Sequence, residues 1–156
     1  YSGIALGSDG EPVCVDASMQ MTSADVKAAL MRLMPLIKER LHYLTDAAEM
    51  VRFLFTEPAV PPVEEIVPKK LDAAKTKEIL LRAKNFVDAV FAMNHEEAEN
   101  LARTEAEAIG VKLGDFMMPV RMAVTGSRIS PPLIGSILIL GKERCLSRIE
   151  KTLERF

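Results

Sequence analysis

Two arginines and a serine hydroxyl lie close together in the C-terminal part of the chain. Arg121, Arg128 and Ser130 are followed by Pro131 and the apolar residue Leu133. A guanidinium offers several N–H donors in a rigid fork, and a hydroxyl both donates and accepts, so this set suits contact with phosphates or with the edges of unpaired bases. Such contacts need a few rigid donors beside an apolar surface, not a globally basic protein. The stretch therefore predicts a binding site.

Residues that would form a catalytic or metal centre are not arranged to do so. His42 and His95 lie far apart, and no Ser–His–Asp order, H-E-x-x-H, C-x-x-C or phosphate-binding glycine loop occurs. Cys14 and Cys145 have no metal-ligand spacing, and Cys145 falls on an apolar helix face, which predicts a buried free thiol. We expect this chain to hold no catalytic residue, no metal and no cofactor.

Composition favours an all-α fold. Hydrophobic residues make up 49% of the chain and aromatic residues only 5%, with no tryptophan. Abundant Ala, Leu and Met pack helices more readily than a β-sandwich or barrel. The formal net charge of −2 excludes a histone-like positive coat but allows a local basic patch. Without a signal peptide or an apolar run of spanning length, a cytoplasmic setting is expected.

Three short helices are predicted from residue 116 onward. Pro119 donates no backbone N–H and is tolerated in a first turn, so a helix should begin just before it and end at Gly126. Ser130 is a good N-cap for the next helix, which would carry two prolines in its first turn and end at Gly141. The third helix has apolar residues at helical spacing. These are Cys145, Leu146, Ile149 and Leu153.

The first helices are predicted upstream of residue 56. A helix should start at Thr22, and Pro35 should kink it or start a new helix that runs to Leu44. Thr45 is expected to cap the following helix, which ends at Phe55.

A proline-rich stretch, residues 57–70, separates these helices from two longer ones. It holds four prolines and is not expected to form a regular helix, so we place there the boundary between two packed helical subdomains, residues 22–68 and 69–156. Residues 1–21, rich in Gly, are expected to be a loosely ordered lead or linker. The first residue, Tyr1, is not Met, which suggests a piece of a longer protein.

Two cap signals mark the helices after this stretch. Asp72 should begin a long helix, and Asn94 with Glu97 should form a capping box for the next one, which should stop at Gly110.

Six segments occur in a fixed order along the chain. They are Leu36-Ile-Lys-Glu-Arg-Leu-His-Tyr-Leu-Thr-Asp, Arg52-Phe-Leu-Phe, Met118-Pro-Val-Arg-Met-Ala-Val-Thr-Gly, Ser130-Pro, Gly141-Lys-Glu-Arg and Arg148-Ile-Glu-Lys. Together they resemble the signature of the C-terminal region of bacterial glutamyl-tRNA synthetases, over roughly residues 30–156. The resemblance implies an all-α anticodon-binding region attached to a catalytic domain that this chain does not contain.

The resemblance implies roles for single residues. Arg121 would contact the first anticodon base. Ser130, Pro131 and Leu133 would hold the middle base, partly through backbone groups. Arg40 matches the arginine that reads the third anticodon letter in members that separate glutamate tRNA from glutamine tRNA.

Other interpretations of these residues stay open. Arg121 could instead form a salt bridge with Glu143, and Arg40 could be an ordinary surface arginine. Arg128 is a candidate phosphate contact, but a solvated turn residue is an equal alternative. Pro132 stands where the family has a smaller, less rigid residue, which puts the backbone geometry of the turn in question.

The resemblance also implies partners. They are the anticodon loop of glutamate tRNA and the chain's own N-terminal catalytic domain, which would use ATP and Mg²⁺ to join glutamate to tRNA. Neither DNA nor a membrane is an expected partner. The alternative is a helical protein-interaction module with an exposed apolar groove, in which the arginines only keep the surface soluble.

Overall fold

The structure is a computed structural model of the 156-residue chain, and it describes residues 5–6, 12–13, 23–38 and 44–156. This described part is mainly helical, which confirms the predicted all-α class. Its helices are α1 (Ser23–Ile37), α2 (Leu44–Phe55), α3 (Val63–Ile66), α4 (Ala73–Val90), α5 (His95–Ala108), α6 (Leu113–Thr125), α7 (Leu133–Leu140) and α8 (Lys142–Leu153).

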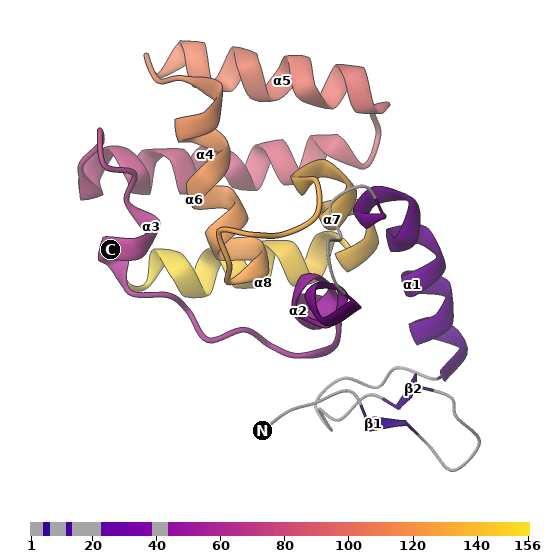
Figure 1. Ribbon diagram of the computed structural model, residues 1–156. Coiled ribbons are helices and arrows are strands. Elements are labelled where there is room, and N and C mark those ends of the chain that lie inside the picture. Colours follow the sequence, from indigo (N-terminus) through magenta and orange to yellow (C-terminus); the bar gives the residue numbers. More distant parts are fainter. Residues whose placement is uncertain (1–4, 7–11, 14–22, 39–43) are drawn as a thin grey trace.

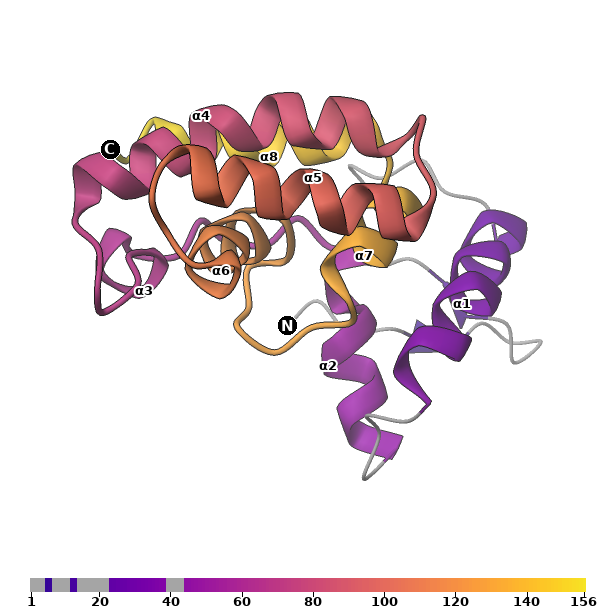
Figure 2. The same ribbon diagram turned by 90° about the horizontal axis from the view of Figure 1, so that it is seen from above.

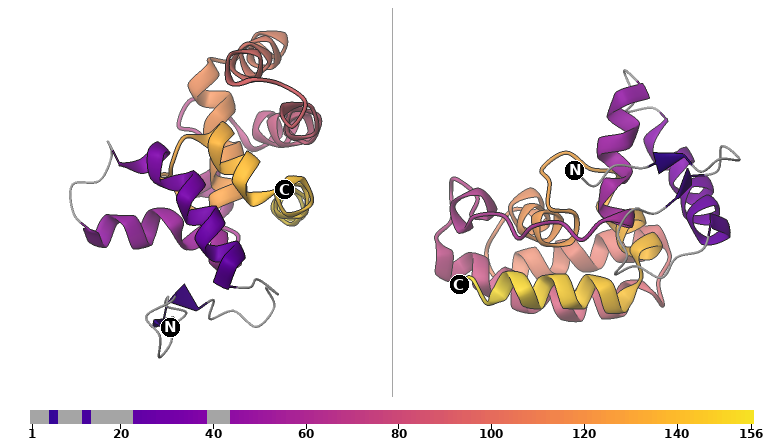
Figure 3. Two further views of the ribbon diagram at one scale, coloured as in Figure 1. Left: turned by 90° about the vertical axis from the view of Figure 1, so that its right-hand side faces the viewer. Right: turned by 90° about the horizontal axis from the view of Figure 1, so that it is seen from below.

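The helices pack around α6 and α7 (Figure 1). Antiparallel helices α4 and α5 both contact α6, and α8 lies along α4 on the side away from α5 (Figure 2). Helix α7 contacts α1 on one side and α8, α4 and α5 on the other (Figure 3, left). Segments far apart in the sequence therefore meet in one hydrophobic core, to which α1, α2 and α4 to α8 all contribute buried residues.

Local sequence signals set the ends of α4 and α5 as predicted. The Asp72 carboxylate accepts a hydrogen bond from the Lys75 amide at 2.7 Å, and Asn94 and Glu97 form the reciprocal bonds of a capping box. Each bond satisfies an amide that has no partner within its helix. Gly110 follows α5 with a φ of 71°, in the left-handed region that glycine enters at little cost.

The predicted start of α6 is wrong. The helix begins at Leu113, six residues before Pro119, so the proline lies past the first turn. A proline there removes one backbone hydrogen bond and costs about 3 kcal/mol. Phe116 and Val120 on the same helix are fully buried in the core, and burying such side chains contributes about 1.5–3 kcal/mol each, which offsets that cost.

The predicted N-cap of α7 is also wrong. This helix begins at Leu133, its N-cap is Pro132, and no side chain caps it. The Ser130 hydroxyl contacts Arg121 instead, so a tertiary partner has displaced the local cap. The predicted stop of α7 at Gly141 is confirmed.

The N-terminal half differs from the predictions in detail: no new helix begins at Pro35, and the kink predicted as the alternative stays a prediction. Pro35 lies inside α1, which ends at Ile37, and the rest of the predicted helix to Leu44 falls mostly on residues outside the described part. Helix α2 starts at Leu44, just before the predicted cap at Thr45, and ends at Phe55 as expected. The proline-rich stretch contains one helical turn, α3, which begins directly after Pro62, a position where proline costs no hydrogen bond.

Two short strands occur where a loosely ordered lead was expected. Strand β1 (Ala5–Leu6) pairs antiparallel with β2 (Pro12–Val13), and the other residues of 1–22 lie outside the described part. The predicted boundary between two subdomains stays a prediction. Within the described residues, no helix is both long and apolar enough to cross a membrane, and no cluster of three or more His, Cys, Asp or Glu side chains is arranged to hold a metal ion.

Candidate nucleic-acid interface

The turn between α6 and α7, residues 126–132, is braced by an arginine from α6. Nη1 of Arg121 donates to the Pro131 carbonyl at 2.9 Å, to the Ser130 carbonyl at 3.2 Å and to the Ser130 hydroxyl. The structure thus brings together three of the residues that the resemblance singled out. Because one guanidinium nitrogen contacts three oxygens of the turn, the backbone of Ser130 and Pro131 is held in one place.

Small hydroxyl residues shape the start of the turn. Gly126 ends α6 with a φ of 71°. The Thr125 hydroxyl donates to the Arg121 carbonyl at 2.9 Å and accepts from the Ser127 amide at 3.3 Å. The Ser127 hydroxyl accepts from the Ile129 amide at 3.2 Å. Such short side-chain bonds replace helical ones and fold the backbone locally.

The side chains of the turn divide into buried and exposed sets. Ser130 and Leu133 are only 4% and 2% exposed, so Leu133 belongs to the core and offers a ligand little more than its backbone. Ile129 is 74% exposed, the highest value among the large hydrophobic side chains that the structure describes. Sequence reasoning missed Ile129, although an isolated β-branched residue in a small polar turn was a visible signal.

Arg128 has a partner that neither interpretation of the sequence named. Its side chain is exposed, and Nη2 donates to the Glu65 carbonyl of α3 at 3.0 Å. This bond uses one of the five N–H donors of the guanidinium. A phosphate contact by Arg128 therefore stays a prediction.

Arg40, the residue expected to read the third anticodon base, falls in 39–43, outside the described part of the chain. Its predicted role is untested.

A second polar cluster, which sequence reasoning missed, is centred on Arg148 of α8. Arg148 is 3% exposed; its Nη1 donates to the Val124 carbonyl at 2.6 Å, and its Nη2 to the Phe53 carbonyl at 2.9 Å and the Thr56 carbonyl at 3.2 Å. These carbonyls stand at the ends of α6 and α2, where helices leave acceptors unsatisfied and carry partial negative charge. One buried guanidinium therefore caps two helices.

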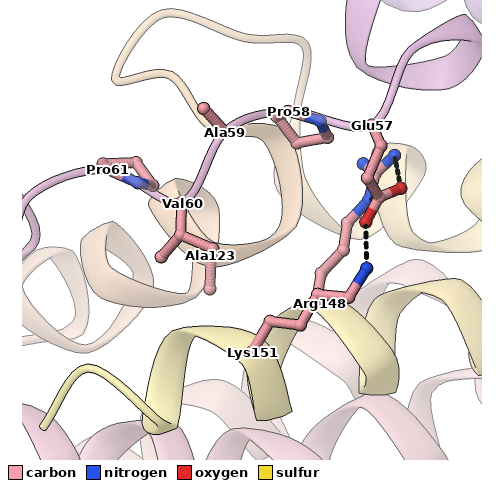
Figure 4. A pocket seen from close by; sticks show the side chains of 8 residues that line it. All are labelled: Glu57, Pro58, Ala59, Val60, Pro61, Ala123, Arg148 and Lys151. Carbon is pink, nitrogen blue, oxygen red and sulfur yellow. Dashed lines mark hydrogen bonds and ion pairs between the residues drawn. The ribbon is translucent and has the colours of Figure 1, made fainter.

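Glu57 balances the charge of this cluster (Figure 4). Its carboxylate lies 3.2 Å from Nη2 of Arg148 and 3.1 Å from Nζ of Lys151. Burial alone raises the pKa of the Glu57 carboxyl, but the two cations outweigh it and hold the pKa below its usual value of 4.5. A cavity of about 10 Å³ beside this group has room for about one water molecule, so it is no ligand pocket.

The arginine-braced turn lies in a helical fold that a known family shares. The chain belongs to the anticodon-binding domain family, whose model matches residues 14–153. This match begins at residue 14, whereas the resemblance in the sequence covered roughly residues 30–156 and did not include residues 1–21.

Similar proteins are glutamate–tRNA ligases. The chain is 59% identical over 131 residues to the ligase of Treponema denticola and 49% identical over 131 residues to that of Treponema pallidum (strain Nichols). These alignments cover 83% of this chain but only 26% and 24% of the relatives. The chain therefore spans about a quarter of the length of these relatives, and it matches their C-terminal part.

A solved structure has a similar fold. It is a glutamate tRNA ligase from Elizabethkingia meningosepticum in complex with its amino acid, matched with a TM-score of 0.55 and 23% identity over 81% of this chain and 25% of that one. At this identity the likeness supports the helical fold and nothing finer.

Proposed function

We propose that this chain is the anticodon-recognition part of a glutamate–tRNA ligase and that the turn between α6 and α7 contacts the anticodon loop. The observation that carries the proposal is the bonding of Arg121 to Ser130 and Pro131, because it rigidifies the very turn that the family signature marks. Unpaired bases of an RNA loop can be splayed out and read by rigid donors and acceptors at such a site.

Each residue of the turn has a proposed task. Arg121 contacts the first anticodon base while it braces the turn, and the backbone groups of Ser130, Pro131 and Leu133 hold the middle base. A backbone role suits Ser130 and Leu133 because their side chains are buried. Ile129 offers an exposed apolar surface on which a base can stack.

Two further arginines complete the proposed interface. Arg40 reads the third anticodon base, which would favour glutamate tRNA over glutamine tRNA. Arg128, exposed within the turn, contacts a backbone phosphate through guanidinium donors other than the one bonded to Glu65.

The remainder of the proposed ligase lies outside this chain. An N-terminal catalytic domain would bind ATP and Mg²⁺ and attach glutamate to the tRNA, while this part would have no catalytic residue or cofactor of its own. A cytoplasmic setting follows from that role, with tRNA and not DNA or a membrane as partner.

The alternative, a helical protein-interaction module, has less support. A groove for a partner helix should expose apolar residues as one stripe. The exposed large hydrophobic side chains of the described residues are instead spread over several elements. They are Met31 and Met34 on α1, Leu81 on α4, Phe91 after α4, Ile129 in the turn and Leu138 on α7.

Filter binding to glutamate tRNA tests the proposal. Wild-type chain should bind the native tRNA more tightly than one with guanine as the third anticodon base, and affinity should fall with salt. Arg40→Ala should erase that preference, a change of about 1–3 kcal/mol if the contact is bidentate. Arg103→Ala, which removes an exposed arginine from α5, is the matched control and should change nothing. Equal loss for Arg103→Ala and Arg121→Ala would count against a specific interface.

A further inference from the structure

The segment between α2 and α4 passes close to the turn that we assign to RNA recognition. We call residues 57–67 the connector; it contains α3. The connector runs past the end of α6 in Figure 3 (right), and Figure 4 shows Pro58 and Val60 above Ala123 of α6. Its contacts fall on the turn itself and on the residues just before it.

The first contact is at the residue where α6 ends. A Cβ atom on Gly126 would lie 2.6 Å from Cβ of Pro58 and 3.4 Å from its Cγ. Cβ atoms essentially never approach another carbon that closely, so the connector packs against a place that only glycine can fill. The beginning of the turn is therefore pressed against Pro58.

Two more interactions link the connector to this region, one of them direct and the other through Arg148. Arg128, within the turn, donates to the Glu65 carbonyl in α3 at 3.0 Å. Arg148 donates to the Val124 carbonyl, just before the turn, and to the carboxylate of Glu57, the first residue of the connector. The connector thus meets the turn directly at Gly126 and Arg128, and it is joined to Val124 through the Arg148 guanidinium.

From these contacts we infer that the connector is a positioning element for the RNA-reading turn, acting through Pro58 and the Glu65 carbonyl. The inference rests on the proposed function. A turn loses its remaining conformational freedom when it binds RNA, and a scaffold that fixes it beforehand lowers that cost. Besides its proposed phosphate contact, Arg128 then also positions the turn, because its Nη2 is bonded to the Glu65 carbonyl of the connector.

The test compares two glycines that have the same backbone conformation. Gly126 and Gly110 both have a φ of 71°, but a Cβ on Gly110 would meet nothing within 4 Å. Gly126→Ala and Gly110→Ala therefore introduce the same left-handed strain, and only Gly126→Ala pushes against the connector. Pro58→Gly removes the opposing Cβ and should relieve the overlap.

Two readouts are measured for each variant: nuclear magnetic resonance order parameters of the amides of residues 127–130, and affinity for glutamate tRNA. We expect Gly126→Ala to lower the order parameters and to weaken binding on the order of tenfold, while Gly110→Ala leaves both near wild type. Adding Pro58→Gly to Gly126→Ala should recover most of the loss. Unchanged order parameters in Gly126→Ala, or equal effects in the two glycine variants, would overturn the inference.

Salt dependence isolates the role of Arg128. Removing a phosphate contact lowers the slope of log affinity against log salt by about 0.7 for single-stranded RNA, whereas removing a positioning contact leaves the slope unchanged. Arg128→Ala should loosen residues 127–130, and turn order unchanged in this variant would contradict its positioning role. If wild-type chain does not bind tRNA, the proposed function fails, but the order parameters still decide whether the connector holds the turn.

Discussion

Arg148 of α8 is paired with Glu57, 91 positions earlier in the chain, with Nη2 3.2 Å from the carboxylate. The same guanidinium caps two helices, because it donates hydrogen bonds to carbonyls at the ends of α2 and α6. A buried charge with this many partners is costly to disturb. It is also one of several points where hydrogen bonds join the two halves of the chain.

Arg148→Ala should lower the free energy of unfolding by about 3–5 kcal/mol, because it leaves buried carbonyls of Phe53 and Val124 without a donor. Urea denaturation followed by circular dichroism measures the loss. Lys151→Ala is the matched control: it removes an exposed cation from the same carboxylate and should cost no more than about 1 kcal/mol. Similar losses in the two variants would contradict the capping role.

Acid should weaken the chain through Glu57. The folded-state pKa of this carboxyl is lowered, so its contribution to stability is complete above the unfolded value of about 4.5 and is lost as pH falls through the folded value. Urea midpoints measured over about pH 3 to 6 should show that loss, and Glu57→Gln should make the curve flatter below pH 4.5. A variant curve parallel to that of wild type would show that Glu57 is not a source of the pH dependence.

The capping box of α5 should be measurable by itself. Asn94→Ala removes the acceptor of the Glu97 amide and should cost about 0.5–2 kcal/mol. Asn94→Gly, which is tolerated at N-caps, should cost only a few tenths. Thermal unfolding of both variants beside wild type checks the order, and an alanine variant as stable as the glycine variant would argue against the cap.

Arg121→Lys should not replace Arg121 in the proposed interface. A lysine keeps the charge but ends a flexible stem in a single nitrogen, so it cannot hold Ser130 and Pro131 through one nitrogen and contact a base through another, as the proposed role of Arg121 requires. We expect affinity for glutamate tRNA to fall nearly as far for Arg121→Lys as for Arg121→Ala, measured by filter binding. Recovery of wild-type affinity by lysine would mean that charge alone matters at this position.

Cys145 should be inert in the native chain. Burial is the main reason that the pKa of its thiol is raised to about 12, so almost no reactive thiolate exists at neutral pH. Cys14→Ser leaves Cys145 as the one cysteine of the sequence. In this variant, the rate of Cys145 alkylation, measured by mass spectrometry, should be low in buffer and high in urea. Arg148→Ala should speed the native reaction, because it loosens the helix that carries Cys145. A native rate equal to the unfolded rate would contradict the burial.

Features set by neighbouring residues were predictable from the sequence. The caps at Asp72 and Asn94 and the stop at Gly110 depend on bonds within a few positions, and the structure confirms them. The start of α6 was not predictable in this way, because the cost of Pro119 is local whereas the burial that offsets it comes from distant helices.

The candidate site was predictable only in part for the same reason. The turn and its residues came from the family resemblance, which identified Arg121 and Ser130 but not their contact. The Ser130 hydroxyl follows the local capping rule in sequence, yet in the fold it has a nearer partner nine positions away. No local pattern distinguishes Arg148 from the other charges of its helix, since its partners Glu57 and Phe53 lie more than ninety positions distant.

The packing of α8 along α4 has a consequence for synthesis of the protein. Helix α4 leaves the ribosome about fifty residues before α8 does, so its apolar face has no α8 to cover it during that interval. At about 5–20 residues per second, the interval lasts some seconds. The part of the α4 surface that α8 covers in the finished fold would meanwhile be open to chaperones. The packing of α4 is therefore completed only after α8 has been synthesised.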